Sequence, residues 1–161
     1  MASREGIVEL WLWRALRTYP RQTAQFLARE PDRFRNPVGH TLREALGILL
    51  EEALEGTSPE RAAAALDSIA QIRAVENCPP GRAFDFLFQL KAILRGQHAE
   101  EELSAPFSRI DQLALQGFDT YMKYREKTYE ARANEARRRV FVLERRLAPE
   151  SQPVWQGRGD K

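Results

Sequence analysis

The residue best placed for chemistry is Arg73, a cation inside a segment that is otherwise mostly apolar. It stands between Ile72 and the pair Ala74–Val75. A buried guanidinium needs a carboxylate or carbonyl partner, because an uncompensated interior charge is costly. Two interpretations stay open, namely binding of an anionic ligand in a cavity or a structural ion pair with Glu44, Glu76 or Asp85. Lys91 raises the same question more weakly.

The single cysteine, Cys78, is a second candidate. It precedes a Pro-Pro-Gly turn and a helical segment, and a helix N-terminus lowers the pKa of a thiol. A redox or nucleophilic role is therefore considered beside a purely structural one, although no histidine is near in sequence. One cysteine excludes a disulfide within the chain.

Cofactor chemistry has little support in the residue types. Haem needs an axial ligand in an apolar pocket, and the two histidines, His40 and His98, both lie in polar surroundings. They are far apart in sequence, with no third ligand at metal spacing. No glycine-rich phosphate loop and no nucleophile elbow is present. We expect no cofactor, no metal and no catalytic activity.

A basic stretch near the end of the chain could bind a partner. Residues 123–146 hold nine basic and four acidic side chains, and the candidate docking residues are Arg132, Arg137, Arg138, Arg139 and Arg145. Mixed charges at helical spacing favour a solvated or dimer-pairing helix. A protein-docking surface is the next interpretation, and nucleic acid the last. The side of the helix from Tyr121 to Val140 is weakly apolar and predicts a poor coiled coil.

The elements that position these residues are all helical. Apolar residues recur three and four apart in residues 4–18, 21–29, 38–54 and 59–75, and in a long helix over 106–147. A central helix carries the apolar run 84–94, and the prolines of the preceding turn can lie in its first turn. Ser3 and Gly56 are expected caps, at most one of Trp11 and Trp13 is expected deep in the core, and Phe34 is expected to anchor its turn. The expected architecture is all-α, with one domain over 1–147 and a flexible tail over 148–161.

Composition limits the function classes further. The net charge of +2 is too small to indicate a polyanion partner over the whole surface. No apolar run approaches the roughly 18–20 residues of a membrane span, and the N-terminal residues lack the apolar run of a signal peptide. The expected location is the cytoplasm.

Three stretches together resemble the N-terminal domain of RsbR-type stressosome regulators, the RsbT co-antagonist family. They are the first helix with its Thr18-Tyr19-Pro20 end, the turn 32–39 (DRFRNPVG), and 72–75 (IRAV) followed by the proline turn, 84–88 (FDFLF) and Leu90-Lys91. The resemblance covers about residues 5–130. It implies a globin-like bundle without haem that pairs as a homodimer and acts as an input module in signalling.

RsbR-type proteins usually continue from the last helix into a STAS domain. This sequence ends at Lys161, so we expect a stand-alone, stressosome-like sensor module. It would transmit a ligand or partner signal through a dimer interface. The alternative is an accessory protein that docks on a redox or respiratory complex through its basic C-terminal helix.

Overall fold

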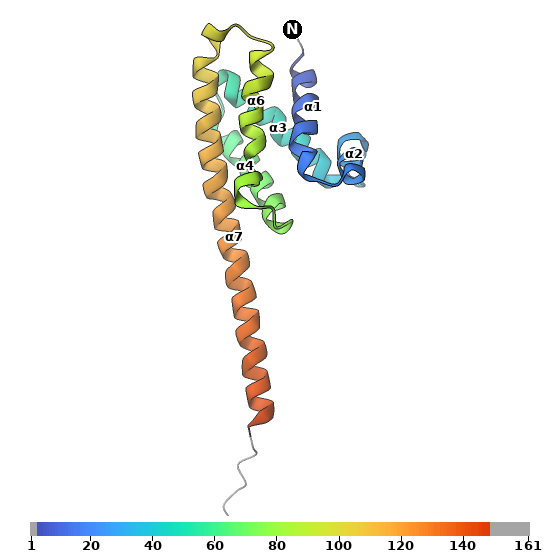
Figure 1. Ribbon diagram of the computed structural model, residues 1–161, viewed down its shortest axis with the longest axis vertical. Helices are drawn as coiled ribbons and strands as arrows, with labels where there is room; N and C mark the ends of the chain where they lie inside the picture. The colour runs from blue at the N-terminus through green and yellow to red at the C-terminus, as the bar shows by residue number, and fades with distance from the viewer. Residues whose placement is uncertain (1–2, 149–161) are drawn as a thin grey trace, which may run out of the picture. The chain divides into compact units, whose positions relative to one another are not determined.

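The computed structural model describes residues 3–148, and this part of the chain contains helices and turns but no strand. In chain order (Figure 1), the elements are α1 (Arg4–Ala15), the 3₁₀ turn η1 (Leu16–Thr18), α2 (Arg21–Arg29), α3 (Pro37–Glu55), α4 (Pro59–Val75), α5 (Pro80–Ala83), α6 (Asp85–Arg95), η2 (Glu100–Glu102) and α7 (Ser104–Leu147). The predicted all-α class and the long C-terminal helix are confirmed. The globin-like arrangement stays a prediction.

The chain divides into two compact units, Met1–Glu126 and Lys127–Lys161. The first holds α1 to α6 and the beginning of α7, and the described part of the second is the remainder of α7. The predicted domain over 1–147 stays a prediction, and the predicted tail over 148–161 lies, apart from Ala148, outside the described residues.

Trp11 lies at the centre of the first unit. It is fully buried, and its Nε1–H donates to the carbonyl of Phe86 at 2.7 Å. The centres of the Trp11 and Phe86 rings are 5.8 Å apart, and this contact joins α1 to α6. Trp13 is 37% exposed, with the Arg29 guanidinium 5.9 Å from its ring. The prediction that at most one of the two tryptophans lies deep in the core is confirmed.

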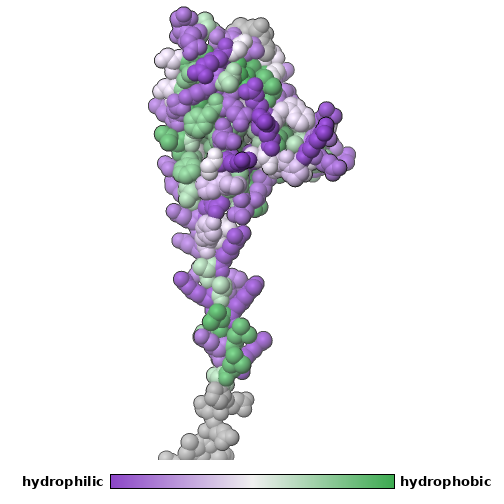
Figure 2. Space-filling model, in the orientation of Figure 1, coloured by the Kyte–Doolittle hydropathy of each residue, from purple (hydrophilic) through white to green (hydrophobic). Residues whose placement is uncertain are grey.

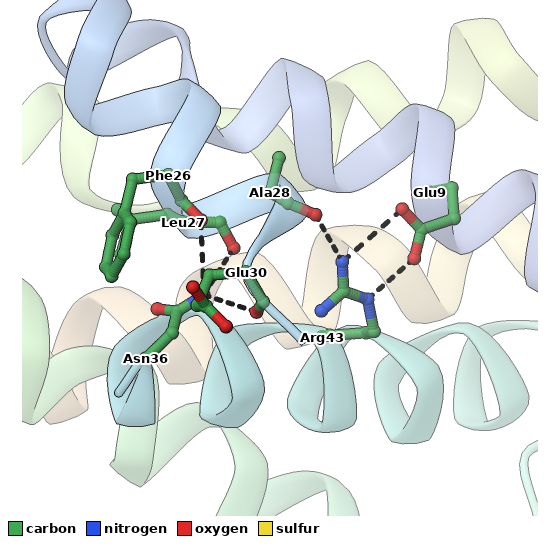
Figure 3. A network of polar contacts seen from close by, with 7 residues as sticks. All are labelled: Glu9, Phe26, Leu27, Ala28, Glu30, Asn36 and Arg43. Carbon is green, nitrogen blue, oxygen red and sulfur yellow. Dashed lines mark hydrogen bonds and ion pairs between the residues drawn. The ribbon is translucent and has the colours of Figure 1, made fainter. Parts of the chain in front are cut away.

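Asn36 and Arg43 hold α1, α2 and α3 together by polar contacts (Figure 3). Asn36 caps α3 by accepting from the Gly39 N–H at 2.8 Å, and its amide donates to the Leu27 carbonyl at 2.9 Å. Arg43 donates to Glu9 of α1 at 2.6 Å and to the carbonyl of Ala28 of α2 at 2.7 Å. The prediction that Phe34 anchors this turn is wrong, because Phe34 is 88% exposed. Asn36 is the buried residue of the turn.

The segment predicted as one central helix is interrupted. α5 ends at Ala83, Phe84 adopts φ −129° and ψ 16°, and α6 begins at Asp85. The Phe84 ring is buried so close to Gly117 of α7 that a Cβ there would lie 2.7 Å from it. Phe88, which belongs to the apolar run of α6, is 53% exposed.

Candidate functional site: a cavity beside Arg73

A cavity of about 510 Å³ lies where η1, the end of α4 and the α4–α5 turn meet. Its lining is rich in polar groups and comprises Thr18, Tyr19, Arg73, Glu76, Asn77, Cys78, Pro79 and Arg82. Two arginines and one glutamate give this lining an excess of positive charge. Such a site favours an anion over a neutral or cationic ligand.

Arg73 is only 1% exposed, although it carries a full charge. Its Nη2 donates to the Ala15 carbonyl and its Nη1 to the Thr18 hydroxyl, both at 3.0 Å. The Tyr19 ring centre lies 5.2 Å from the guanidinium carbon. The buried Nε has no hydrogen-bond partner among residues 3–148. Arg73 therefore fastens the end of α1 to α4 and still has an unused donor.

Glu76 is the carboxylate nearest to Arg73, but its strongest partner is Tyr19. The single hydrogen of the Tyr19 hydroxyl is shared between the two oxygens of Glu76, which lie 2.7 and 2.6 Å from the hydroxyl oxygen, whereas Arg73 Nη1 is 4.0 Å from the nearer carboxylate oxygen. Burial raises the pKa of Tyr19 well above its ordinary value, with Arg73 opposing the shift and the bond to Glu76 adding to it. Tyr19 thus remains a donor at any physiological pH.

The α4–α5 turn connects this cavity to α7. The Cys78 carbonyl accepts from the Tyr121 hydroxyl and from Arg125 Nη1, the latter at 3.2 Å. Arg125 also donates to the Asn77 side chain at 3.4 Å, and Asn77 itself has a left-handed backbone, with φ 54°. The same turn therefore lines the cavity and receives the hydrogen bonds of α7. The sequence did not place Tyr121 or Arg125 at this turn, because nothing local indicates a partner more than 40 residues away.

Cys78 is buried, with 8% of the residue exposed, and its Sγ lies 3.7 Å from the Pro79 carbonyl oxygen. Burial raises the pKa of this thiol, with Arg73 opposing the shift. This direction is opposite to the lowering expected from a helix N-terminus. Since the thiolate is the nucleophile, the environment disfavours reactivity.

Slow alkylation of Cys78 is therefore expected. Treated with iodoacetamide at pH 7.5, the folded protein should react at least about tenfold more slowly than the same protein in urea, because burial limits both access and thiolate content. Intact mass spectrometry at timed intervals measures both rates. Equal rates would contradict the buried, protonated thiol.

Lys91 does not line the Arg73 cavity. Its ammonium donates to Asp111 of α7 at 2.6 Å and lies 5.4 Å from the Phe107 ring centre, so it joins α6 to α7. The histidines pair with neighbouring glutamates, His40 with Glu44 and His98 with Glu102. Within residues 3–148 no three histidine, cysteine or acidic side chains lie close enough together to hold a metal ion.

The five candidate docking arginines lie in the second unit, and all are exposed: Arg132, Arg137, Arg138, Arg139 and Arg145. Arg139 pairs with Glu135 at 3.1 Å, and Arg145 lies 5.9 Å from the Phe141 ring centre. Apolar side chains are exposed among them, as Figure 2 shows near the end of α7. One line of exposed residues, which we name the α7 stripe, comprises Tyr129, Ala133, Ala136, Val140, Leu143 and Leu147.

The chain matches the family model described as "RsbT co-antagonist protein rsbRD N-terminal domain" over residues 5–136. It therefore belongs to this family, whose members are regulatory domains, and the resemblance expected from the sequence is confirmed. No curated protein and no solved structure matches the chain. None of the helices in the described part of the chain has the length and apolarity needed to cross a bilayer.

Proposed function

We propose that the protein is a non-catalytic sensor module that pairs with a second copy along the α7 stripe and transmits a signal through that interface. The family supports a regulatory role, and the stripe supports the pairing. Its six residues are spaced alternately four and three apart, the repeat with which two helices pack in a coiled coil. Val140 and Leu143 are more than half exposed in the single chain, and Leu147 is 81% exposed.

The charges beside the stripe favour a parallel pair. Arg132, Arg139 and Arg146 follow one edge of the stripe at seven-residue intervals. In an antiparallel pair this edge would face its own copy, and like charges would oppose one another. In a parallel pair this edge would instead face the other edge of the second copy, five residues further along, which places Arg139 opposite Glu144 and Arg132 opposite Arg137. One attractive pair then stands beside one like-charge pair, whereas the antiparallel arrangement would bring only arginines of this edge together.

The double variant Val140→Asp/Leu143→Asp is expected to be monomeric where the wild type is dimeric. Two apolar contacts per copy become buried charges, which should weaken pairing by more than about a hundredfold. Light scattering coupled to size exclusion, over a range of protein concentrations, measures the change. The matched control is Phe141→Asp/Val142→Asp, which places the same charges on neighbouring exposed positions outside the stripe.

The control variant should retain the mass of two chains. A wild type that is monomeric at all concentrations would overturn the pairing. Equal dissociation of the two double variants would show that the α7 stripe is not the interface.

A further inference from the structure

We propose that the Arg73 cavity binds a small oxyanion, a carboxylate or a phosphate, which competes with Glu76 for the buried guanidinium. The proposal rests on the proposed function in one respect: the anion would be the signal that the module senses. It names a binding site and a ligand class for a regulatory domain.

Unused hydrogen-bond donors are the first argument. Arg73 is buried, and its Nε–H has no acceptor within the described part of the chain. Arg82 lines the same cavity and is exposed, and its guanidinium makes no hydrogen bond or ion pair with any described residue. The Thr18 hydroxyl accepts from Arg73 and so keeps its own hydrogen to donate. Guanidinium groups bind carboxylate and phosphate oxygens through short, charge-assisted hydrogen bonds.

The weak internal pairing is the second argument. A charge-assisted bond between a guanidinium and a carboxylate is ordinarily about 2.7–2.9 Å long. Arg73 and Glu76 are 4.0 Å apart, since the Glu76 carboxylate is turned to the Tyr19 hydroxyl. An incoming oxyanion could therefore bind Arg73 at closer range than Glu76 does. The cavity volume of about 510 Å³ lies within the usual range of small-molecule sites.

The position of the cavity is the third argument. Glu76 and Cys78 belong to the turn whose carbonyl oxygen accepts from Tyr121 and Arg125 of α7. An anion that displaces Glu76 would change the environment of this turn. The binding event would thus act on groups that hydrogen-bond directly to α7, the helix that carries the proposed interface.

Isothermal titration of the full chain with inorganic phosphate and, separately, with succinate tests the site at constant ionic strength. We expect at least one probe to bind the wild type. Arg82→Gln should weaken that binding about tenfold, the typical effect of losing a charged hydrogen bond. Glu76→Gln should tighten it several-fold, because the internal competitor loses its charge. Arg61→Gln is the matched control on α4: Arg61 pairs with Glu51 at 3.2 Å, does not line this cavity, and should leave binding unchanged.

The opposite signs expected for Arg82→Gln and Glu76→Gln separate a binding site from a general loss of structure, and circular dichroism verifies that both variants fold. Binding of phosphate alone or succinate alone would support the site and identify the anion. No binding of either probe, or equal binding by wild type and Arg82→Gln, would overturn it. Light scattering on the same samples keeps the two proposals apart: a dimer that binds no anion refutes only the site, whereas a monomer that binds one refutes only the pairing.

Discussion

Replacing Gly39 by alanine is expected to destabilise the first unit by about 2–5 kcal/mol, combining overpacking with loss of a helix cap. A Cβ at Gly39 would lie 2.2 Å from the Leu27 carbonyl oxygen and 2.3 Å from the Asn36 amide nitrogen. These two groups are hydrogen-bonded to each other, so neither can move without losing the bond that joins α2 to α3. Urea denaturation followed by circular dichroism measures the free energy of unfolding.

Gly47→Ala is the matched control on the same helix. A Cβ at Gly47 would meet no atom within 4 Å. Alanine restricts the unfolded chain more than glycine does, so this variant should be more stable than the wild type by about 0.5–1 kcal/mol. Effects of the same sign at the two glycines would refute the close packing described at Gly39.

Trp11→Ala is expected to cost about 3–5 kcal/mol, a large part of the stability of a domain of this size. The substitution removes a fully buried ring and leaves the Phe86 carbonyl without the indole N–H that it accepts. Because α1 and α6 meet at this ring, the loss should appear as a lower midpoint of cooperative unfolding. Thermal and urea melts both measure it.

Trp13→Ala is the comparison for Trp11, since it deletes the same side chain two residues away. Trp13 is partly exposed and contributes mainly its contact with Arg29. Its loss should cost less than about 1 kcal/mol, the usual size of an exposed cation–π contact. Similar losses at the two positions would contradict the arrangement of α1.

Much of the fold could be predicted, because the signals that start and stop its helices are local. The interval expected for α2 is the observed one, the Ser3 side chain caps α1 at the Gly6 N–H, and Gly56 ends α3 in the left-handed conformation. Phe34 and the break at Phe84 could not be predicted. The break at Phe84 depends on a residue distant in sequence, because Gly117 of α7 provides space for the Phe84 ring. At the other turn the buried residue is Asn36, two residues after Phe34, because its amide bonds to the carbonyl of Leu27 in α2.

Arg73 could be recognised as a candidate because a cation among apolar residues is a visible local conflict. Its position beside Tyr19 and Thr18 could not, because those contacts join segments more than 50 residues apart. Glu76 was one of three carboxylates considered, and the structure places another, Glu44, beside His40 instead.

The basic C-terminal helix was recognised by charge, while its exposed apolar line was not. Sequence reasoning followed the side of the helix that contains Tyr121, and that residue is fully buried within the first unit. The exposed residues of the second unit follow another register, from Tyr129 to Leu147. Choosing between the registers requires knowing which part of the helix the bundle already covers.

The contact between Gly117 and Phe84 limits how α7 can move. Leu113 and Ala114 lie about one turn before Gly117 on the same side of α7, and Thr120 and Tyr121 lie about one turn after it. A slide of α7 along its own axis would therefore bring a residue with a Cβ into the space of the Phe84 ring. Such a contact resists compression but not separation, unlike the hydrogen bonds at the Cys78 carbonyl, which resist separation. Within the first unit, a movement of α5 and α6 toward α7 would therefore be transmitted by the Phe84 ring. A movement of the α4–α5 turn away from α7 would be transmitted by the hydrogen bonds of Tyr121 and Arg125.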